Sequence, residues 1–195
     1  HTIIPRDIQY PPQDSKQYRF EQIGAHDLHQ LDDLYDIFYI KAIDHIHDWP
    51  GIFSSVRKIA KIGSIFIIKH YSFFSFLGPH RYATTTIPWG HLLLSDSEYR
   101  RFVHQHHGYR EESMLNFYFE GLAYPRTPMS EMVKIARENG FLAKIIVNEA
   151  PRHAEEKMHL SSLVDNFWGM IRNNHPRVSE EEVMSGRYHI LFQAI

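Results

Sequence analysis

The chain has 195 residues, a formal net charge of −2 and no cysteine, and 43% of its residues are hydrophobic. This length suits one domain with a sizeable core, and the absence of cysteine excludes disulfides, thiol nucleophiles and thiolate metal sites. A chain without cysteine fits a reducing compartment, so we expect a cytoplasmic protein. No run of lysine and arginine and no apolar run of roughly 18 residues is present, so we expect neither nucleic acid nor membrane as a partner.

The first third of the chain contains three short apolar segments. A β-branched run ends at Asp7, and residues 18–23 form a second predicted strand with a turn at Gly24. Residues 35–42 are apolar almost without interruption, which is typical of a strand buried on both faces of a sheet. We therefore expect a sheet to begin here, with an acidic side chain at the end of its first segment.

A helix and another strand follow. Asp48 can cap the first turn of the helix, Pro50 is tolerated there, and apolar residues recur every three to four positions, until Gly63 is expected to end it. The next segment, residues 64–74, is again a continuous apolar run. Strand, helix and strand with short joints indicate a βαβ unit and therefore a parallel sheet.

Residues 72–125 interrupt this pattern and form a predicted insertion. Its first part, residues 73–94, is rich in aromatic residues without a sustained period, so we expect a long, ordered loop. A helix follows, with Ser95 and Glu98 as a capping box and Gly108 as its end. The chain has 15 histidines, but the cluster at 104–108 ends this helix, where protonatable residues are favoured, and we do not expect a metal site there.

The last third returns to regular elements. A helix is predicted from the Thr127 cap and Pro128 to Gly140, followed by a strand at 141–149. The polar segment 151–186 is expected to be partly helical, with a second capping box at Ser179 and Glu182, and residues 187–195 form a final strand. Because no internal repeat or linker divides the chain, we expect a single domain over residues 1–195.

The segment "YDIFYIKAIDHIHDW…IFSSVRKIAKIGSIFIIKHYS" resembles the middle of the class I S-adenosylmethionine-dependent methyltransferases. In that family a strand with an "FDxV" start leads to a histidine-bearing corner, a helix, a "KPGG" turn and another strand. Tyr35-Asp36-Ile37 matches the strand start, His45 matches the corner, and Lys61-Ile62-Gly63-Ser64 matches the turn. The predicted helix 128–139 and strands 141–149 and 187–195 resemble the family's last helix and its closing antiparallel pair.

This resemblance implies an α/β fold with a Rossmann-like methyltransferase sheet, mostly parallel and with a closing antiparallel pair. It covers roughly residues 3–70 and 126–195. The family's first strand and its glycine-rich "GxGxG" loop have no counterpart, since residues 1–23 contain no glycine. Glycine is needed in such a loop because the backbone must approach the cofactor closely. We therefore expect a methyltransferase fold truncated at the N-terminus.

The resemblance also implies positions for S-adenosylmethionine. Asp7 matches the acid that accepts hydrogen bonds from the ribose hydroxyls, as in dinucleotide folds. The adenine-facing segment matches residues 24–28, where either Asp27 replaces the family's acid or backbone groups of Ala25 and His26 hold the adenine. The methionine end of the cofactor matches Ile40 and Lys41.

Candidate residues for binding the substrate that accepts the methyl group lie at the predicted carboxyl edge of the sheet, where ligand sites of such folds are found. In "IDHIHDWPG", His45 and His47 either face the substrate or only order the corner between strand and helix. His45, His70 and His80 are candidate catalytic bases, because the pKa of histidine, near 6.5, suits removal of a hydroxyl proton. His47 and three residues of the insertion, Arg81, Tyr82 and Trp89, are candidate substrate contacts. For the two aromatic residues among them, packing is the alternative.

The sequence therefore favours a methyltransferase that transfers a methyl group to a hydroxyl of a small molecule or a glycan. The alternative is a non-catalytic remnant of the same fold that serves as a binding or dimerisation module, and a homodimer is left open. A hydrolase with histidine-bound metal is a third interpretation, but the histidines of residues 43–51 lack a ligand set of known zinc spacing. We expect no metal.

Overall fold

The computed structural model describes residues 21–76, 78, 85, 88–121, 126–149 and 154–195. The candidate site residues Asp7, His80, Arg81 and Tyr82 lie outside these ranges. Four strands form one sheet: β1 (Tyr35–Ile40), β2 (Ala60–His70), β3 (Phe141–Glu149) and β4 (Arg187–Ala194). Of the predicted strand at 18–23, the described residues 21–23 have no strand structure.

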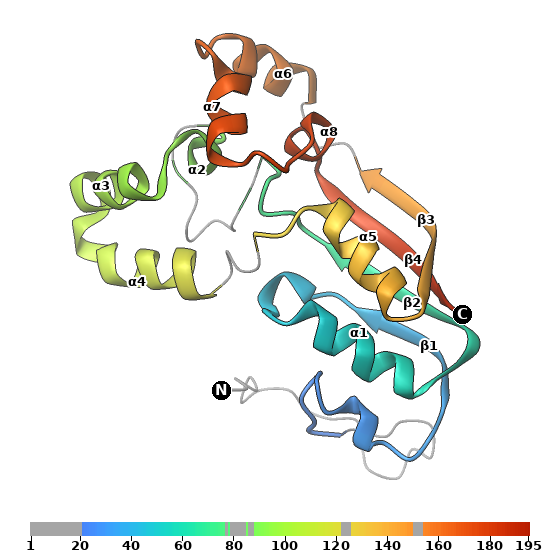
Figure 1. The fold of residues 1–195 in the computed structure, drawn as a ribbon. Coiled ribbons are helices and arrows are strands. Elements are labelled where there is room, and N and C mark those ends of the chain that lie inside the picture. The colour runs from blue at the N-terminus through green and yellow to red at the C-terminus, as the bar shows by residue number, and fades with distance from the viewer. Residues whose placement is uncertain (1–20, 77, 79–84, 86–87, 122–125, 150–153) are drawn as a thin grey trace.

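The sheet has the strand order β1-β2-β4-β3 (Figure 1). β1 runs parallel to β2, whereas β4 runs antiparallel to both of its neighbours, β2 and β3. The predicted closing antiparallel pair is therefore confirmed. A mostly parallel sheet is not found among the described strands, because the last strand inserts between β2 and β3 and makes two of the three strand pairs antiparallel.

The described helices divide into two groups. Two of them, α1 (Trp49–Lys58) and α5 (Met129–Glu138), cover the sheet. The others lie beyond the carboxyl edge of β2 (Figure 1), and they are α2 (Gly90–Leu93), α3 (Asp96–His107), α4 (Glu111–Asn116), α6 (Ala154–Ser162), α7 (Phe167–Asn174) and α8 (Glu180–Val183). Short 3₁₀ turns occur at Leu28–Gln30, Ile43–His45 and Gly108–Arg110, and a π turn at Phe117–Gly121.

The helix predicted after Asp48 is confirmed, but its end is not where the sequence predicts it. The Asp48 carboxylate accepts a hydrogen bond from Gly51 N at 2.9 Å, which satisfies a free donor of the first turn. The helix ends at Lys58, and β2 already begins at Ala60, which pairs with Tyr35. Gly63, predicted as the helix stop, lies within β2 at φ +87°. Pairing with β1 therefore takes residues 60–63 into the sheet.

Two further predicted caps have different outcomes. The capping box of Ser95 and Glu98 at the start of α3 is complete. At α8 the Ser179 hydroxyl accepts from Glu182 N at 3.1 Å, but the Glu182 carboxyl group forms its hydrogen bonds with other segments. At α5 no side chain caps the first turn, and Pro128 precedes the helix as its N-cap residue in place of the predicted Thr127.

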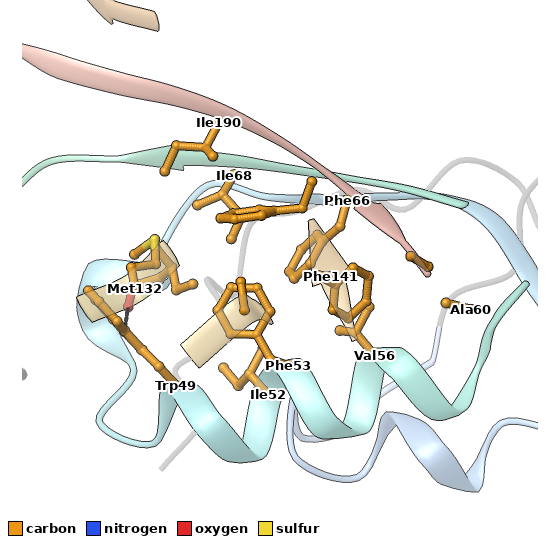
Figure 2. Packing of buried hydrophobic residues seen from close by; sticks show 14 of the residues in the cluster. Trp49, Ile52, Phe53, Val56, Ala60, Phe66, Ile68, Met132, Phe141 and Ile190 are labelled. Atoms are coloured by element: carbon orange, nitrogen blue, oxygen red, sulfur yellow. Dashed lines mark hydrogen bonds between the residues drawn. The ribbon is translucent and has the colours of Figure 1, made fainter. Parts of the chain in front are cut away.

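The first core lies between the sheet and the helices α1 and α5. Figure 2 shows Phe53 of α1 beneath Phe66 of β2 and beside Phe141 of β3. These rings meet at tilted and edge-to-face angles with centroids 5.5–5.9 Å apart, which is a favourable arrangement for aromatic pairs. This core fixes α1 against β2 and so holds the corner that leads into α1 at the edge of the sheet.

The second core joins the predicted insertion to the segment 164–184. Phe73, Trp89 and Tyr99 of the insertion are buried together with Phe167 and Ile171 of α7. The predicted long loop at 73–94 is thus wrong in part, because Gly90–Leu93 forms the helix α2 and Trp89 is one of its buried anchors. The insertion packs mainly on helices that follow β3.

Candidate functional site

The carboxyl ends of β1 and β2 lie at one edge of the sheet because the two strands are parallel. After β1 the chain passes through Lys41 and the turn Ile43–His45 to Asp48 at the start of α1. Lys41, His45 and His47 are exposed at this corner. The structure therefore places three of the predicted site residues on one accessible edge.

The segment after Gly24 lies against the same corner. His26 Nε2 is 3.4 Å from Asp48 Oδ2, and His29 N donates a hydrogen bond to Ser55 Oγ of α1 at 3.1 Å. Gly51 leaves room for this contact: a Cβ there would lie 2.1 Å from Asp48 Oδ2 and 2.9 Å from the His26 ring. The motif "IDHIHDWPG" thus serves as a helix start whose glycine admits a second segment.

The other predicted cofactor residues have different environments. Ala25 and Ile40 are partly buried and pack against the first core, so their side chains hold the segments in place. Asp27 lies in the turn that follows Gly24, with its N–H donating to Gly24 O at 2.9 Å and its Oδ1 accepting from Gln30 Nε2 at 3.2 Å. Lys41 remains as an exposed cation at the end of β1.

The exposed His45 has an acidic neighbour. His45 Nε2 lies 3.6 Å from Asp44 Oδ2, on the turn that follows β1. Within the described ranges, no group of three or more histidine, aspartate or glutamate side chains could hold a metal ion. The corner therefore offers imidazole and carboxylate groups for hydrogen bonding and proton transfer.

His70 ends β2 behind this corner and is 3% exposed. The Trp49 ring meets it edge-on at 5.4 Å, and Trp49 Nε1 donates to Ile43 O at 3.0 Å, so the indole closes the corner over His70. Neither ring nitrogen of His70 has a hydrogen-bond partner among the described residues. Burial lowers the pKa of His70 to about 3, so the imidazole is neutral and a weak base. In this structure a substrate in solvent does not reach it.

His70 makes the protein sensitive to acid. Its pKa is about 3 in the folded chain against an ordinary value of 6.5, so only the unfolded chain binds its proton between these values. The stabilising contribution is complete above pH 6.5 and is lost as the pH falls toward 3, by up to ~1.4 kcal/mol per pH unit. We expect His70→Phe to flatten this part of the stability profile, measured by urea unfolding from pH 7 to pH 4. The exposed His159→Phe should leave the slope unchanged, and equal slopes in all three proteins would contradict the prediction.

Trp89, a predicted substrate contact, lies in the second core. Its Nε1 donates to Val183 O at 3.0 Å, and its ring meets Phe76 and Phe167 edge-on at 4.8 and 5.1 Å. The indole is buried on all sides and presents no free face to a substrate. Trp89 is therefore not a substrate contact as predicted but a packing residue, because Phe167 and Val183, both distant in sequence, contact its ring and its N–H.

The sequence interpretation missed a buried polar junction just after β2. The Ser72 hydroxyl donates to Glu182 Oε1 at 2.5 Å, and the N–H of Met129 donates to both carboxyl oxygens of Glu182 at 3.1 Å. All three groups are buried. Burial raises the pKa of Glu182, while the hydrogen bonds from Ser72 and Met129 act in the opposite direction. The sequence pattern at Ser179 predicted that Glu182 belongs to a capping box, but it did not indicate that Glu182 binds Ser72 and Met129.

No family model and no curated protein matches the chain. Solved structures that align with it include phosphoethanolamine N-methyltransferase 2 of Haemonchus contortus with S-adenosylmethionine, at 17% identity and a TM-score of 0.39 over 87% of this chain and 35% of that one. A protein of Listeria monocytogenes described as an S-adenosylmethionine-dependent methyltransferase aligns at 11% identity and a TM-score of 0.45, over 90% and 68% of the two chains.

Geranyl diphosphate C-methyltransferase of Streptomyces coelicolor, with Mg²⁺, geranyl diphosphate and S-adenosylhomocysteine, aligns at 14% identity and a TM-score of 0.40, over 86% of this chain and 51% of that one. The chain thus spans about a third of the Haemonchus enzyme and about half of the Streptomyces enzyme. All three structures are described as methyltransferases. Among the described residues, no helix is long and apolar enough to cross a membrane.

Proposed function

We propose that this chain forms part of a class I methyltransferase that transfers the methyl group of S-adenosylmethionine to a hydroxyl of a small molecule or a glycan. The proposal rests on the sequence resemblance over residues 3–70 and 126–195 and on the β1-β2-β4-β3 sheet with its closing antiparallel pair. The resemblance implies S-adenosylmethionine as the cofactor. The contacts at the edge of the sheet support the proposed arrangement of the residues that would bind it.

The observation that carries the proposal is the contact between His26 and Asp48, at 3.4 Å. It brings the segment matched to the adenine, residues 25–27, to the corner that follows Ile40 and Lys41, the residues matched to the methionine end. A bound cofactor must touch both segments at once. The local groups fit this ligand, because Lys41 is an exposed cation suited to a carboxylate and the turn after Gly24 exposes polar groups.

The exposed corner histidines are better suited to the acceptor than His70. The cofactor supplies a methyl group on a sulfonium sulfur, and the chain must align the acceptor oxygen and take its proton. We assign proton removal to His45, which is exposed beside Asp44, and acceptor contact to His47. Because burial holds the pKa of His70 near 3, its role in this proposal is to support the corner beneath Trp49.

The alternative is a binding or dimerisation module that retains the fold without catalysis. One observation favours it: one face of the sheet exposes a set of large apolar side chains, among them Ile37 and Tyr39. A large exposed apolar surface of this kind is typical of an interaction site. Cofactor binding separates the two functions.

The first test is calorimetric titration with S-adenosylhomocysteine. We expect micromolar binding, weakened by about tenfold or more in Asp7→Ala and Lys41→Ala, because each removes a charged partner of the ligand. Glu155→Ala, at an exposed position of α6, is the matched control and should bind like the unaltered chain. Absence of binding in the unaltered, folded chain would contradict the methyltransferase proposal and favour the binding module.

A further inference from the structure

One face of the sheet is covered by helices and the other is open. Among the described residues, the main helix contacts of the sheet come from α1 and α5, whose core partners Phe66 and Phe192 point to the same side. On the opposite side, the registered pairs place Tyr39, Ile67, Leu191 and Ile145 in one row across all four strands. We call this side of the sheet the open face.

The open face is unusually apolar for a surface in contact with water. Ile37 is 68% exposed, Tyr39 62% and Ile145 53%, and Ile65 and Val147 belong to the same side by register. The near-continuous apolar sequence of β1 and β2 is the pattern of strands covered on both faces, and parallel strand pairs are normally covered in this way. The sequence of these strands therefore indicates that another layer packs on the open face, and the described residues do not provide this layer.

The apolar patch on the open face is comparable with a protein–protein interface. Ile37, Tyr39, Ile145 and Val147 are each about half exposed or more and form one apolar patch, and monomers rarely expose such a patch beyond a few hundred Å². Packing on a second copy would bury these side chains together with the polar residues of the same face, Lys69, His189, Gln193 and Glu149. A standard interface buries roughly 800 Å² per partner. An apolar centre with a polar rim is the usual anatomy of such an interface.

We propose that the open face is the interface between two copies of this chain, packed sheet on sheet. Homodimers are most often related by a twofold axis, and packed sheets keep their strands within about 30° of each other. A twofold axis along the strands places β1 of one copy over β3 of the other and β2 over β4, because the strand order is β1-β2-β4-β3. Tyr39 then lies opposite Ile145 across the interface, and each copy covers the other's apolar row.

The test is sedimentation equilibrium over a range of protein concentrations, with circular dichroism as the check of folding. We expect the unaltered chain to be a dimer and both Tyr39→Lys and Ile145→Glu to be monomers, since each buries an unpaired charge in the interface. Leu163→Glu is the matched control, because Leu163 is 65% exposed on the helical part of the molecule. This variant should remain a dimer.

An equimolar mixture of Tyr39→Lys and Ile145→Glu chains tests the geometry. In a mixed dimer the introduced lysine meets the introduced glutamate on one side, and the unaltered pair remains on the other, so dimers should return. A monomeric unaltered chain would overturn the proposal and mean that something else covers the face. Dimers that persist in both single variants, or a mixture that stays monomeric, would overturn the open face or the twofold arrangement as the interface.

Discussion

Phe53→Ala is expected to lower the free energy of unfolding by about 3–5 kcal/mol, the usual cost of removing a fully buried phenylalanine ring. Phe53 has no exposed surface and lies at the centre of the first core. Its ring contacts Phe66, Phe141 and Phe192, one on each of β2, β3 and β4, at 5.5–5.9 Å. No single small shift can fill the space left by this ring, because its neighbours belong to three strands of one hydrogen-bonded sheet.

The measurement is urea unfolding followed by circular dichroism, at a pH near 7. Lys58→Ala, an exposed change on the same helix, is the control and should alter the free energy of unfolding by less than about 0.5 kcal/mol. A loss below 1 kcal/mol for Phe53→Ala would mean that α1 does not pack on the sheet as described. In that case the corner at Asp48 would not be held at the edge of the sheet either.

Glu182→Ala is expected to lower the free energy of unfolding by about 2–4 kcal/mol. The change leaves the Ser72 hydroxyl and the N–H of Met129 buried without an acceptor, and each unsatisfied buried group costs about 1–3 kcal/mol. Glu181→Ala is the matched control, since the neighbouring Glu181 is exposed. Equal effects of the two changes in urea unfolding would show that the junction of β2, α5 and α8 does not depend on the Glu182 carboxyl group.

The pH dependence of the same junction gives an independent readout of Glu182. Because burial raises the pKa of Glu182 above its ordinary 4.5, the unfolded chain releases this proton at a lower pH than the folded chain does. The contribution of Glu182 to stability is therefore complete below pH 4.5 and declines as the pH rises toward the raised folded pKa. Glu182→Gln should lack this decline. The window overlaps those of three buried histidines, His70, His91 and His175, whose lowered pKa values act with opposite sign. The readout is therefore the difference in slope between Glu182→Gln and the unaltered chain.

The elements that depend on neighbours in sequence could be predicted. Asp48 and Ser95 cap helices as expected, because a cap needs only a side-chain oxygen within three residues of a free N–H. The strand at Phe141–Glu149 agrees with its prediction for a similar reason, since it is apolar and lies between a glycine and a polar segment. The helix end predicted at Gly63 failed because strand pairing with β1, and not a local stop signal, decides where β2 begins.

Some features of the candidate site could likewise be predicted from the sequence, and others could not. The resemblance and the residue types identified the corner of His45 and His47, which follows directly from chain order at the end of β1. They did not predict that His26 would contact Asp48, or that Trp49 would seal His70 from solvent. Both contacts join segments separated by 20 or more residues, and a sequence pattern with a period of two or 3.6 residues holds no information about such pairs.

The sequence by itself determined the order of the main helices and strands after Gly24 and the caps at Asp48 and Ser95, because apolar periodicity and short-range hydrogen bonds control these features. The closing pair of β3 and β4 was implied by the family resemblance. Only the tertiary structure decided that Trp89 and His70 are buried, that Glu182 joins three segments, and that one face of the sheet remains open. Burial depends on which distant surfaces meet, and that is settled when the sheet and the two cores assemble.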